Sequence, residues 1–571
     1  MKTHTLRQWI SALLMVGPLS VAATETQPLP RPVPSVPATT ITWGECSSSL
    51  VAAPETLKSR VQCGQLDVPL DHHNPDGRTL TVALVRIAAG NPAERRGSIF
   101  FNPGGPGSSP MSVLPLYAWL WSNITPGDPI HGLTREVGEK YDLIGVVPRG
   151  LNGGTTYSCQ SPEADVAFND VIADRSPANI AAVDLAVRRY VAACKDHPFR
   201  PYITTEQNVF DLDLVRRSLG EAKLNYFGIS YGTWMGIWYA SLYPASTGRM
   251  LLDSSMDWTG TMETNLLASA PEQQARFNRT VADPMAAAST RYGMGNTRDA
   301  IIARIRALSP RVREAWASDY RYPESVLAAV AASEWLTTNP DLGSDDMKSI
   351  ASSYVFSTDP QVNERAQAEA RRMVSSYFLP NNAANRISLT PAYSVLLSTT
   401  CNDSPTVRDT TWWQNTIADY SHRYPAAVGD HLFYHCALWG GPQTVQPTLQ
   451  ALVNVPDILM IHSEYDVVTP LTSAMRSFEA TPSAHMIVAR GADEHGFFGH
   501  TETACIERVV ASFLLDGIKP ADRLTNCQIA LPSPGSSPLP SGYSDPLLAK
   551  TLREYLLRSR GFNGWRPGFR Q

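Results

Sequence analysis

Charge is scarce in this sequence and is not gathered into blocks. Charged residues make up 18% of its 571 residues, and the formal net charge is −5 at pH 7. Proteins that bind nucleic acids or anionic membrane surfaces usually carry clusters of Lys and Arg. The composition therefore predicts neither partner, and it favours small or peptide substrates.

Metal and redox motifs are also missing. The eight cysteines form no C-x-x-C pair, and the sequence has no H-E-x-x-H stretch, so we expect neither a metal nor a cofactor. An even number of cysteines instead favours disulfides in an oxidising compartment. Eight cysteines allow many pairings, with buried free thiols as the alternative. The preferred pairs are neighbours along the chain: Cys46–Cys63, Cys159–Cys194, Cys401–Cys436 and Cys505–Cys527.

Long apolar runs are absent except at the beginning of the chain. Two basic residues precede the apolar stretch 9–23, which ends in small residues, and this pattern predicts a cleaved signal peptide over 1–23. A membrane anchor is the alternative, but Gly17 and Pro18 interrupt the stretch, and it is short for a span. A Pro-rich linker is expected over 24–40. We therefore predict a secreted or periplasmic protein without stable membrane insertion.

The rest of the chain predicts a large domain with an insertion. Strand-like and helical segments alternate over 41–259 and again over 451–530, which indicates an α/β fold with a mostly parallel sheet. Between them, 260–450 contains helical, Ala- and Arg-rich stretches and is interpreted as a helical lid. A C-terminal extension continues to residue 571, with an amphipathic helix expected over 545–561.

The stretch G-I-S-Y-G at 228–232 matches the G-x-S-x-G pattern of a nucleophile elbow. A strand-like run over 224–230 precedes it, and a helical run over 234–244 follows. Small residues on both sides of Ser230 relieve the crowding of a sharp turn from strand to helix. By itself the motif is equally consistent with a chance match in a loop, but the strand–turn–helix context favours Ser230 as a nucleophile.

A serine nucleophile needs a base and a group that orients the base. In α/β-hydrolases these arrive in the order Ser, acid, His, from the ends of later strands. Asp466 follows one such strand and His495 follows the next, so they are the predicted acid and base. Glu464 and His500 are the respective alternatives.

The glycine-rich stretch 100–110 follows another predicted strand and contains N-P-G-G-P-G. Gly104 and Gly105 present backbone N–H groups without a side chain in the way, and the Tyr231 N–H follows the nucleophile directly. Alone, the stretch is typical of a simple turn. Beside the elbow it predicts an oxyanion hole marked by Gly104 and Tyr231.

Several motifs occur together in a characteristic order over roughly residues 40–530. They are CGQLDVPLDH, NPGGPG, PRG at 148–150, DLDLVRRSLG, GISYGT, TTCNDSP, HCALWGGP and DVVTP. Together they resemble secreted tripeptidyl aminopeptidases, which are relatives of the prolyl iminopeptidases with an α/β-hydrolase fold. The resemblance implies the triad Ser230, Asp466 and His495, the oxyanion hole, and a lid that selects substrates.

Two segments depart from the pattern of this family. Val147 stands before PRG where an Asp is usual, and D-S-S-M-D-W at 253–258 replaces the usual Asp-Gly. Neither change touches the predicted triad.

A peptidase that reads a free N-terminus also needs a carboxylate to meet the substrate ammonium. Asp403 is the first candidate and Glu334 the second, although either could simply be a solvated acid or a helix cap.

The expected function is that of an exported serine aminopeptidase that releases short peptides or single residues from free N-termini. A carboxylesterase acting on small or lipidic esters is the alternative, because both reactions pass through an acyl-enzyme and a tetrahedral oxyanion. A binding protein on a hydrolase scaffold is a third interpretation, disfavoured because no triad member is missing.

Overall fold

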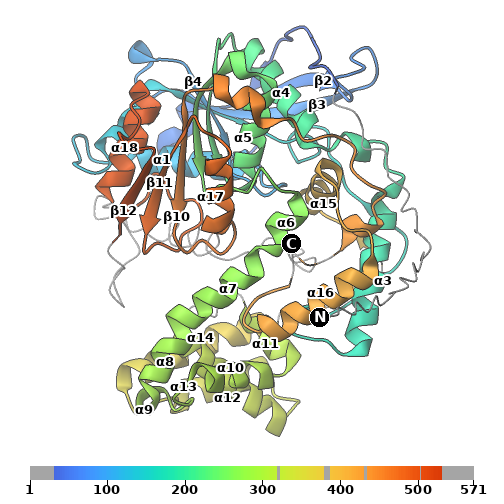
Figure 1. Cartoon of the computed structure of the whole chain (residues 1–571), viewed down its shortest axis with the longest axis vertical. Helices are drawn as coiled ribbons and strands as arrows, with labels where there is room; N and C mark the ends of the chain where they lie inside the picture. The colour runs from blue at the N-terminus through green and yellow to red at the C-terminus, as the bar shows by residue number, and fades with distance from the viewer. Residues whose placement is uncertain are drawn as a thin grey trace, which may run out of the picture.

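The computed structural model describes residues 31–529, apart from 318–321, 379–385, 430, 431, 433 and 502. Figure 1 shows a layered α/β part at the top and a bundle of helices below it, with α6 (Met262–Leu267) and α7 (Ser269–Phe277) running from one to the other. The predicted signal peptide (1–23) and C-terminal helix (545–561) lie outside the described residues, as do 24–30 of the predicted linker.

The α/β part is built on a single sheet, whose described strands run in the order β1-β2-β3-β5-β4-β7-β8-β10-β11-β12. From β5 to β12 the strands are parallel, whereas β1, β2 and β3 pair antiparallel, and β3 pairs antiparallel with β5. The strands are β1 (Thr42–Gly44), β2 (Val61–Pro69), β3 (Thr79–Ile87), β4 (Ser98–Asn102), β5 (Asp142–Val146), β7 (Leu224–Ile229), β8 (Thr247–Asp253), β10 (Ile458–Ser463), β11 (Ala484–Arg490) and β12 (Leu524–Gln528).

Helices cover both faces of this sheet, because its central strands are apolar on both sides. One core contains side chains of α1, α2 and α18, and the core on the opposite face contains those of α4, α5 and α17. Figure 1 shows α18 and α1 on one side of the strands. The helices are α1 (Pro110–Ser122), α2 (Gly132–Lys140), α4 (Thr205–Ser218), α5 (Tyr231–Leu242), α17 (Leu471–Glu479) and α18 (Ala504–Asp516).

The chain between β8 and β10 is mainly helical, and its described residues add no strand to the large sheet. Helices α8–α14, here called the helical lobe, enclose a separate apolar core. The helices are α6 (Met262–Leu267), α7 (Ser269–Phe277), α8 (Asp283–Ala287), α9 (Ser289–Tyr292), α10 (Arg298–Ala307), α11 (Pro310–Ala317), α12 (Pro323–Thr338), α13 (Ser344–Ser353), α14 (Pro360–Tyr377), α15 (Pro391–Asp403) and α16 (Thr410–Arg423).

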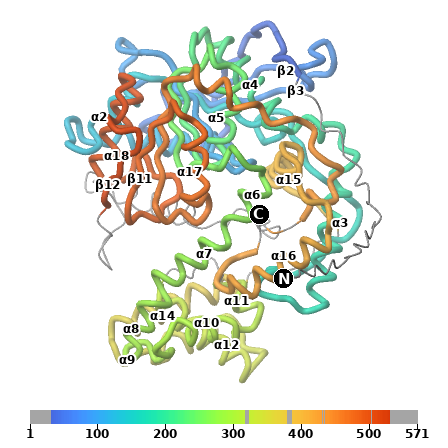
Figure 2. Tube along the Cα trace, in the orientation of Figure 1, coloured from blue at the N-terminus to red at the C-terminus, as the bar shows by residue number. Residues whose placement is uncertain are grey.

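Part of the chain before β7 also packs with this helical region. Strand β6 (Gln160–Ser161) pairs with β9 (Ile387–Ser388), and α3 (Pro177–Lys195) shares an apolar cluster with α16. Figure 2 shows α3 and α16 beside each other, away from the sheet. The cover over the sheet edge is therefore assembled from two separate stretches of sequence. The predicted limits of the lid, 260 and 450, stay a prediction.

One predicted helical stretch is divided in the structure. The Ala- and Arg-rich stretch 299–320, part of the predicted helical lid, has the pattern of one helix, whereas α10 ends at Ala307 and α11 begins at Pro310. Proline has no N–H to donate and disfavours a helical residue before it, so it begins a helix more readily than it continues one.

Candidate active site

Ser230 occupies the sharp turn between β7 and α5. Its backbone has φ 58°, and apart from Ser254 it is the only described non-glycine residue with positive φ. A left-handed conformation is costly for a residue with a Cβ and is found mainly at functional sites. The turn exposes the serine at the carboxyl end of the strand and leaves the Tyr231 N–H at the start of α5, where a helix has no internal acceptor.

Asp466 and His495 are in direct contact. The two loops that carry them follow neighbouring parallel strands, β10 and β11. His495 Nδ1 lies 2.8 Å from Asp466 Oδ2. The other carboxylate oxygen accepts hydrogen bonds from the N–H groups of Val468 at 2.8 Å and Thr469 at 3.1 Å. Asp466 is fully buried, so these bonds fix its orientation.

The electrostatics of this pair favour an ionised acid beside a basic imidazole. Burial disfavours the charged form of Asp466, but the charge and hydrogen bond of His495 outweigh it, and the pKa of Asp466 falls below its usual value. Burial also opposes the charged form of His495, but Asp466 outweighs it and raises the pKa of His495 above its ordinary value. His495 is thereby a stronger base than a free imidazole.

The two alternatives have other partners. Glu464 accepts a hydrogen bond from the Gly491 N–H at 2.8 Å and pairs with Arg490. His500 is buried next to Tyr117, with ring centroids 6.4 Å apart. Of the two predicted acids, Asp466 is therefore the one that the structure brings to His495.

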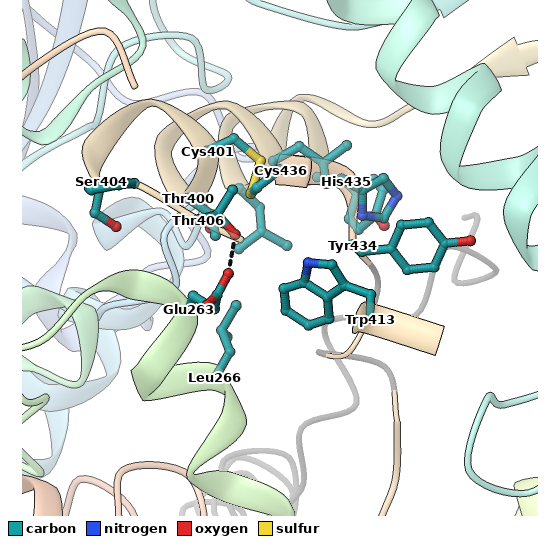
Figure 3. A pocket seen from close by; sticks show the side chains of 14 residues that line it. Glu263, Leu266, Thr400, Cys401, Ser404, Thr406, Trp413, Tyr434, His435 and Cys436 are labelled. Atoms are coloured by element: carbon teal, nitrogen blue, oxygen red, sulfur yellow. Dashed lines mark hydrogen bonds between the residues drawn. A yellow bond between two sulfur atoms is a disulfide. The ribbon is translucent and has the colours of Figure 1, made fainter. Parts of the chain in front are cut away.

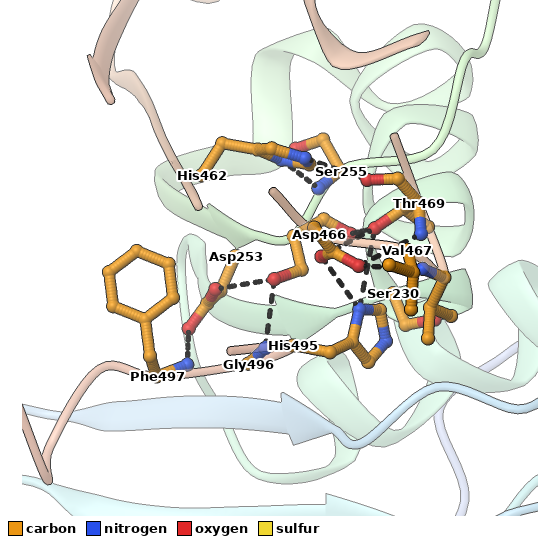
Figure 4. Close-up of polar contacts among 12 residues, drawn as sticks. Ser230, Asp253, Ser255, His462, Asp466, Val467, Thr469, His495, Gly496 and Phe497 are labelled. Carbon is orange, nitrogen blue, oxygen red and sulfur yellow. Dashed lines mark hydrogen bonds and ion pairs between the residues drawn. The ribbon is translucent and has the colours of Figure 1, made fainter. Parts of the chain in front are cut away.

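A dipeptide at the end of β8 connects the predicted triad positions. The Asp253 carbonyl accepts the Ser230 N–H at 3.0 Å, and its carboxylate accepts the N–H groups of Phe497 and Phe498 at 2.8 and 3.0 Å. Ser254 Oγ accepts the Gly496 N–H at 2.8 Å. Figure 4 shows the bonds made by Phe497 and Gly496, together with the contact between His495 and Asp466.

Ser254 also reaches the loop of the acid. Its carbonyl accepts a hydrogen bond from Thr469 Oγ1 at 3.0 Å, and Thr469 Oγ1 lies 3.0 Å from Asp466 Oδ2. Ser254 belongs to the second segment that departs from the expected family pattern, and its φ of 55° is a conformation that favours glycine. A serine at this position supplies a hydroxyl that glycine would lack.

The glycine-rich loop after β4 lies against the elbow. A Cβ on Gly104 would be 2.5 Å from the Ile229 carbonyl oxygen and 2.9 Å from Ser230 Cβ, so only glycine allows this approach. The Gly104 N–H, however, donates to Asn102 Oδ1 at 2.8 Å. The Gly105 N–H has no acceptor among the described residues. Gly104 thus provides the close approach, and Gly105 has the available donor.

Neither of the two carboxylates expected to meet a substrate amine is placed to do so. Asp403 is fully buried, and its oxygens accept bonds from the N–H and hydroxyl of Thr205. Burial raises the pKa of Asp403 to about 7. Glu334 is exposed on α12, in the helical lobe. This expectation was therefore wrong for Asp403 in particular, because its short side chain points into the packing between α15 and α4.

Three of the family motifs meet in the packing of the α/β part, since Arg149, Asp211 and His72 each belong to a different motif. Arg149 of PRG forms a two-point ion pair with Asp211, with N–O distances of 2.6 and 2.8 Å. His72 Nε2 lies 2.7 Å from the same carboxylate. All three side chains are buried. Val147 stands before PRG, where the related family was expected to have an Asp. It is buried in an apolar core, where a valine leaves no charge unpaired.

A pocket lies beside α15, and Figure 3 shows it from close by. Its lining is mainly apolar: Leu266, Tyr393, Leu396, Leu397, Thr400, Pro405, Trp413 and Tyr434 contribute, with Glu263 as the acidic side chain among the lining residues.

Helix α15 connects this pocket to the elbow at both of its ends. A Cβ on Gly107 would lie 2.4 Å from the Ala392 carbonyl oxygen, so the glycine-rich loop packs on the start of the helix. At the other end, Asp403 holds Thr205, whose hydroxyl is 2.6 Å from the Tyr231 hydroxyl. The pocket and the surroundings of Ser230 thus share one helix, α15.

All eight cysteines form disulfides, and the pairs are the four predicted ones. Such a pattern is typical of proteins from oxidising compartments. Within the described residues, no helix is both long and apolar enough to cross a membrane.

The sequence alone did not single out Asn102, Asp253 or Thr469. A partial signal existed for Asp253, because it ends an apolar run after the elbow helix, as Asp466 ends another. The carboxyl ends of neighbouring parallel strands meet at one edge of the sheet. The roles of Asn102 and Thr469 depend on distances within turns, which carry no periodic signal.

Comparisons with known proteins agree with this architecture. Residues 425–527 match the family model described as "TAP-like protein". The tripeptidyl aminopeptidase of Streptomyces lividans is 27% identical over 86% of this chain and 88% of its own. Serine protease Hip1 of Mycobacterium tuberculosis is 25% identical over 84% of this chain and 89% of its own. Carboxylesterase B of the same species is 26% identical over 90% of this chain and 94% of its own.

The predicted fold is confirmed, because the strand order, the helices on both faces and the matched family model agree. By name, these relatives are an aminopeptidase, a serine protease and a carboxylesterase, and each is similar over 84–90% of this chain. This chain is therefore a serine hydrolase with the α/β-hydrolase fold and a relative of the tripeptidyl aminopeptidases.

Proposed function

We propose that this enzyme is an exported serine aminopeptidase, with Ser230 as nucleophile, His495 as base and Asp466 as the group that orients the base. The observation that carries the proposal is the 2.8 Å contact between His495 and Asp466, at the sheet edge that presents the strained Ser230 turn. The tripeptidyl aminopeptidase relative supports the choice of peptides as substrates.

In the first half of the reaction, His495 Nε2 takes the Ser230 proton as the hydroxyl attacks the scissile carbonyl. Asp466 keeps the other ring nitrogen protonated and stabilises the imidazolium that forms. His495 then protonates the leaving amine, and an acyl-enzyme remains. In the second half, the same imidazole activates a water that releases the peptide acid.

The negative charge that develops on the carbonyl oxygen needs two donors. We assign them to the N–H groups of Tyr231 and Gly105, since the Gly104 N–H is bound to Asn102. Losing one such donor typically lowers kcat by about 10²–10³-fold. The Tyr231 N–H also lies at the start of α5, where the helix dipole favours an anion.

For the substrate amine, the pocket beside α15 offers Glu263. Its Oε2 accepts bonds from the Thr406 hydroxyl and from the Val407 N–H at 2.8 Å. Its Oε1 has no hydrogen-bond partner among the described residues. Figure 3 shows the carboxylate at one end of the pocket, with Trp413 and Tyr434 further along it. An ammonium beside Glu263 would thus be paired with charge in largely apolar surroundings, where a charge-assisted bond is strong.

The test compares peptide anilides with a free and an acetylated N-terminus. We expect kcat/KM to be at least about tenfold higher for the free amine, because one charge-assisted bond differs. Glu263→Gln should abolish this preference, whereas Glu334→Gln, which removes an exposed acid in the lobe, should keep it. Equal rates for the two anilides with the natural enzyme would refute the aminopeptidase assignment.

Export is the remaining part of the proposal. The four disulfides support it, since they persist in oxidising compartments. Expression with residues 1–23 in a bacterial host should yield processed protein outside the cytoplasm. Intact protein retained in the cytoplasm would contradict this.

An ester substrate is the second candidate, favoured by the apolar lining of the pocket and by the carboxylesterase relative. Short acyl esters assayed beside the free-amine anilides separate the two. Higher kcat/KM on esters, together with no preference for a free amine, would identify a carboxylesterase.

A further inference from the structure

Helix α7 follows α6 and runs toward the helical lobe, as Figure 1 shows, and its start contacts the loop that carries the predicted acid. Its first residue is fixed to that loop, because Ser269 Oγ donates to the Val467 carbonyl at 2.6 Å. After Phe277 the helix continues as a π-helical turn, η5 (Asn278–Ala282). Such turns are rare and occur frequently at functional sites.

Two arginines three residues apart, Arg276 and Arg279, occupy this stretch. The Arg279 guanidinium lies over the Tyr465 ring, with Cζ 3.5 Å from the ring centroid, and Tyr465 immediately precedes Asp466. Burial lowers the pKa of Arg276, and the nearby charges of Asp493 and Asp466 act in the opposite direction. The pair therefore lies at the rim of the active site.

The guanidinium groups have buried donors without acceptors. Nε of Arg276 and both Nε and Nη2 of Arg279 are buried, and no hydrogen-bond partner is found for them among the described residues. A buried unsatisfied donor costs about 1–3 kcal/mol, and more when it is charged. Folded proteins rarely retain several of these in one place unless a ligand or water completes them.

Acidic side chains are near but do not fill this role. Glu272 and Asp493 influence the arginines through their charges. Within the described residues, neither accepts a hydrogen bond from either guanidinium. They balance part of the positive charge without accepting a bond from the buried donors. A planar carboxylate has the geometry to accept two parallel bonds from such a group.

We propose that Arg276 and Arg279 form a subsite for a substrate carboxylate at the rim of the active site. The inference rests on the proposed hydrolysis of peptides at Ser230 and adds a substrate class: short peptides with a free carboxylate. That carboxylate is either the C-terminal group of a short peptide or an acidic side chain. Both carboxylates would bind the guanidinium groups in the same way, and the experiment below distinguishes between them.

The experiment measures kcat/KM for three tetrapeptides with free N-termini: the C-terminal acid, its amide, and an amide with aspartate at the last position. We expect the acid to exceed the plain amide by about tenfold or more, from charge-assisted bonds. If the aspartyl amide is also favoured, the subsite accepts side chains; if it is not, the subsite reads the C-terminus.

The variant Arg276→Gln/Arg279→Gln should bring the ratio of acid to amide close to one. Arg298→Gln is the matched control, because Arg298 is an exposed arginine that pairs with Asp283. That variant should keep the ratio. An acid and amide cleaved equally by the natural enzyme, or a ratio that survives the double substitution, would overturn the proposal. A fall of both rates by the same factor would also overturn it, because it indicates a structural role.

Two further measurements keep the test independent of folding and of the peptidase assignment. Competitive inhibition of the natural enzyme by a free tripeptide should exceed that by the tripeptide amide about tenfold, and equal inhibition would oppose the subsite. If peptides are not cleaved at all, the proposed function fails. The subsite is then tested by comparing a succinate monoester with the matching neutral ester, where equal rates would reject it.

Discussion

The sheet edge at Ser230 and the pocket beside α15 are built in opposite ways. At the sheet edge, Asp253, Ser254 and Thr469 connect the loops of the predicted triad through short hydrogen bonds. The pocket is lined mainly by apolar side chains from α6, α15 and α16, and its polar contacts concentrate at Glu263. Positional accuracy and substrate preference are therefore assigned to different parts of the molecule.

This difference has a physical basis. Proton transfer requires donor and acceptor within a few tenths of an ångström, and directional bonds hold such distances. Apolar contacts are not directional, so a pocket made of them can change its shape at a modest cost. Substitutions at the sheet edge should accordingly lower kcat on every substrate, whereas those in the pocket should change the preference among substrates.

The largest effect should come from Ser230→Ala. We expect kcat to fall about 10⁴–10⁶-fold, since the nucleophile is lost. The midpoint of thermal unfolding should not fall, because the Ser230 hydroxyl makes no hydrogen bond with the residues that the structure describes. Stopped assays and thermal unfolding measure the two quantities. Ser352→Ala, on the exposed side of α13, is the control, and a Ser230→Ala enzyme that keeps its turnover would remove Ser230 from the site.

Next in size is Asp466→Asn, with an expected fall in kcat of about 10⁴-fold. The neutral form of His495 accepts the proton, so activity should rise with pH through the pKa of His495. Asp466 raises that pKa above the ordinary value of about 6.5. The acid limb of kcat/KM should therefore lie above pH ~6.5 in the natural enzyme and move to lower pH in the variant. A limb that stays in place would show that another group titrates.

A smaller effect is expected from Ser254→Gly. Glycine relieves the positive φ, so the free energy of unfolding should rise by about 1 kcal/mol. The bond to the Gly496 N–H is lost, and kcat should fall about tenfold, from one lost hydrogen bond, with KM unchanged.

Ser254→Ala separates these two effects, because it loses the hydroxyl but keeps the strain. It should show the same fall in kcat without the gain in stability. Equal kcat in all three enzymes, measured by steady-state kinetics, would mean that Ser254 does not position His495.

The smallest effect should follow Thr400→Leu, which replaces a threonine of the pocket lining with a larger, wholly apolar side chain. We expect the preference for bulky over small residues near the substrate N-terminus to fall by about tenfold or less, with kcat on small substrates retained. Thr411→Leu, exposed on α16, is the control. A uniform loss on all substrates would contradict the assignment of this pocket to substrate preference.

Much of the fold was predictable because its signals are local. The elbow, the strands that precede the loops of Asp466 and His495, and the neighbouring cysteine pairs each depend on a short stretch of sequence. Strand β8 was not predicted, since its run T-G-R-M-L-L-D has no alternation and follows a helix closely. Asp253 and Ser254 were missed together with it.

The carboxylates of the site were harder to assign. Asp403 and Glu263 are both acids in the helical region, and no spacing in the sequence distinguishes a buried one from one that lines a pocket. The hydrogen bond from the Gly104 N–H to Asn102 could not be predicted either, because it depends on the rotamer of Asn102.

The disulfides bear on how the molecule can move. The four pairs join residues 17, 35, 35 and 22 positions apart. The chain has three segments here: before β8, between β8 and β10, and after β10. No disulfide joins one of these segments to another. Covalent cross-links therefore stiffen individual loops without clamping the helical lobe to the sheet. Swinging of the lobe is opposed only by noncovalent packing and the main chain, so oxidation is compatible with an enzyme that opens and closes at every turnover.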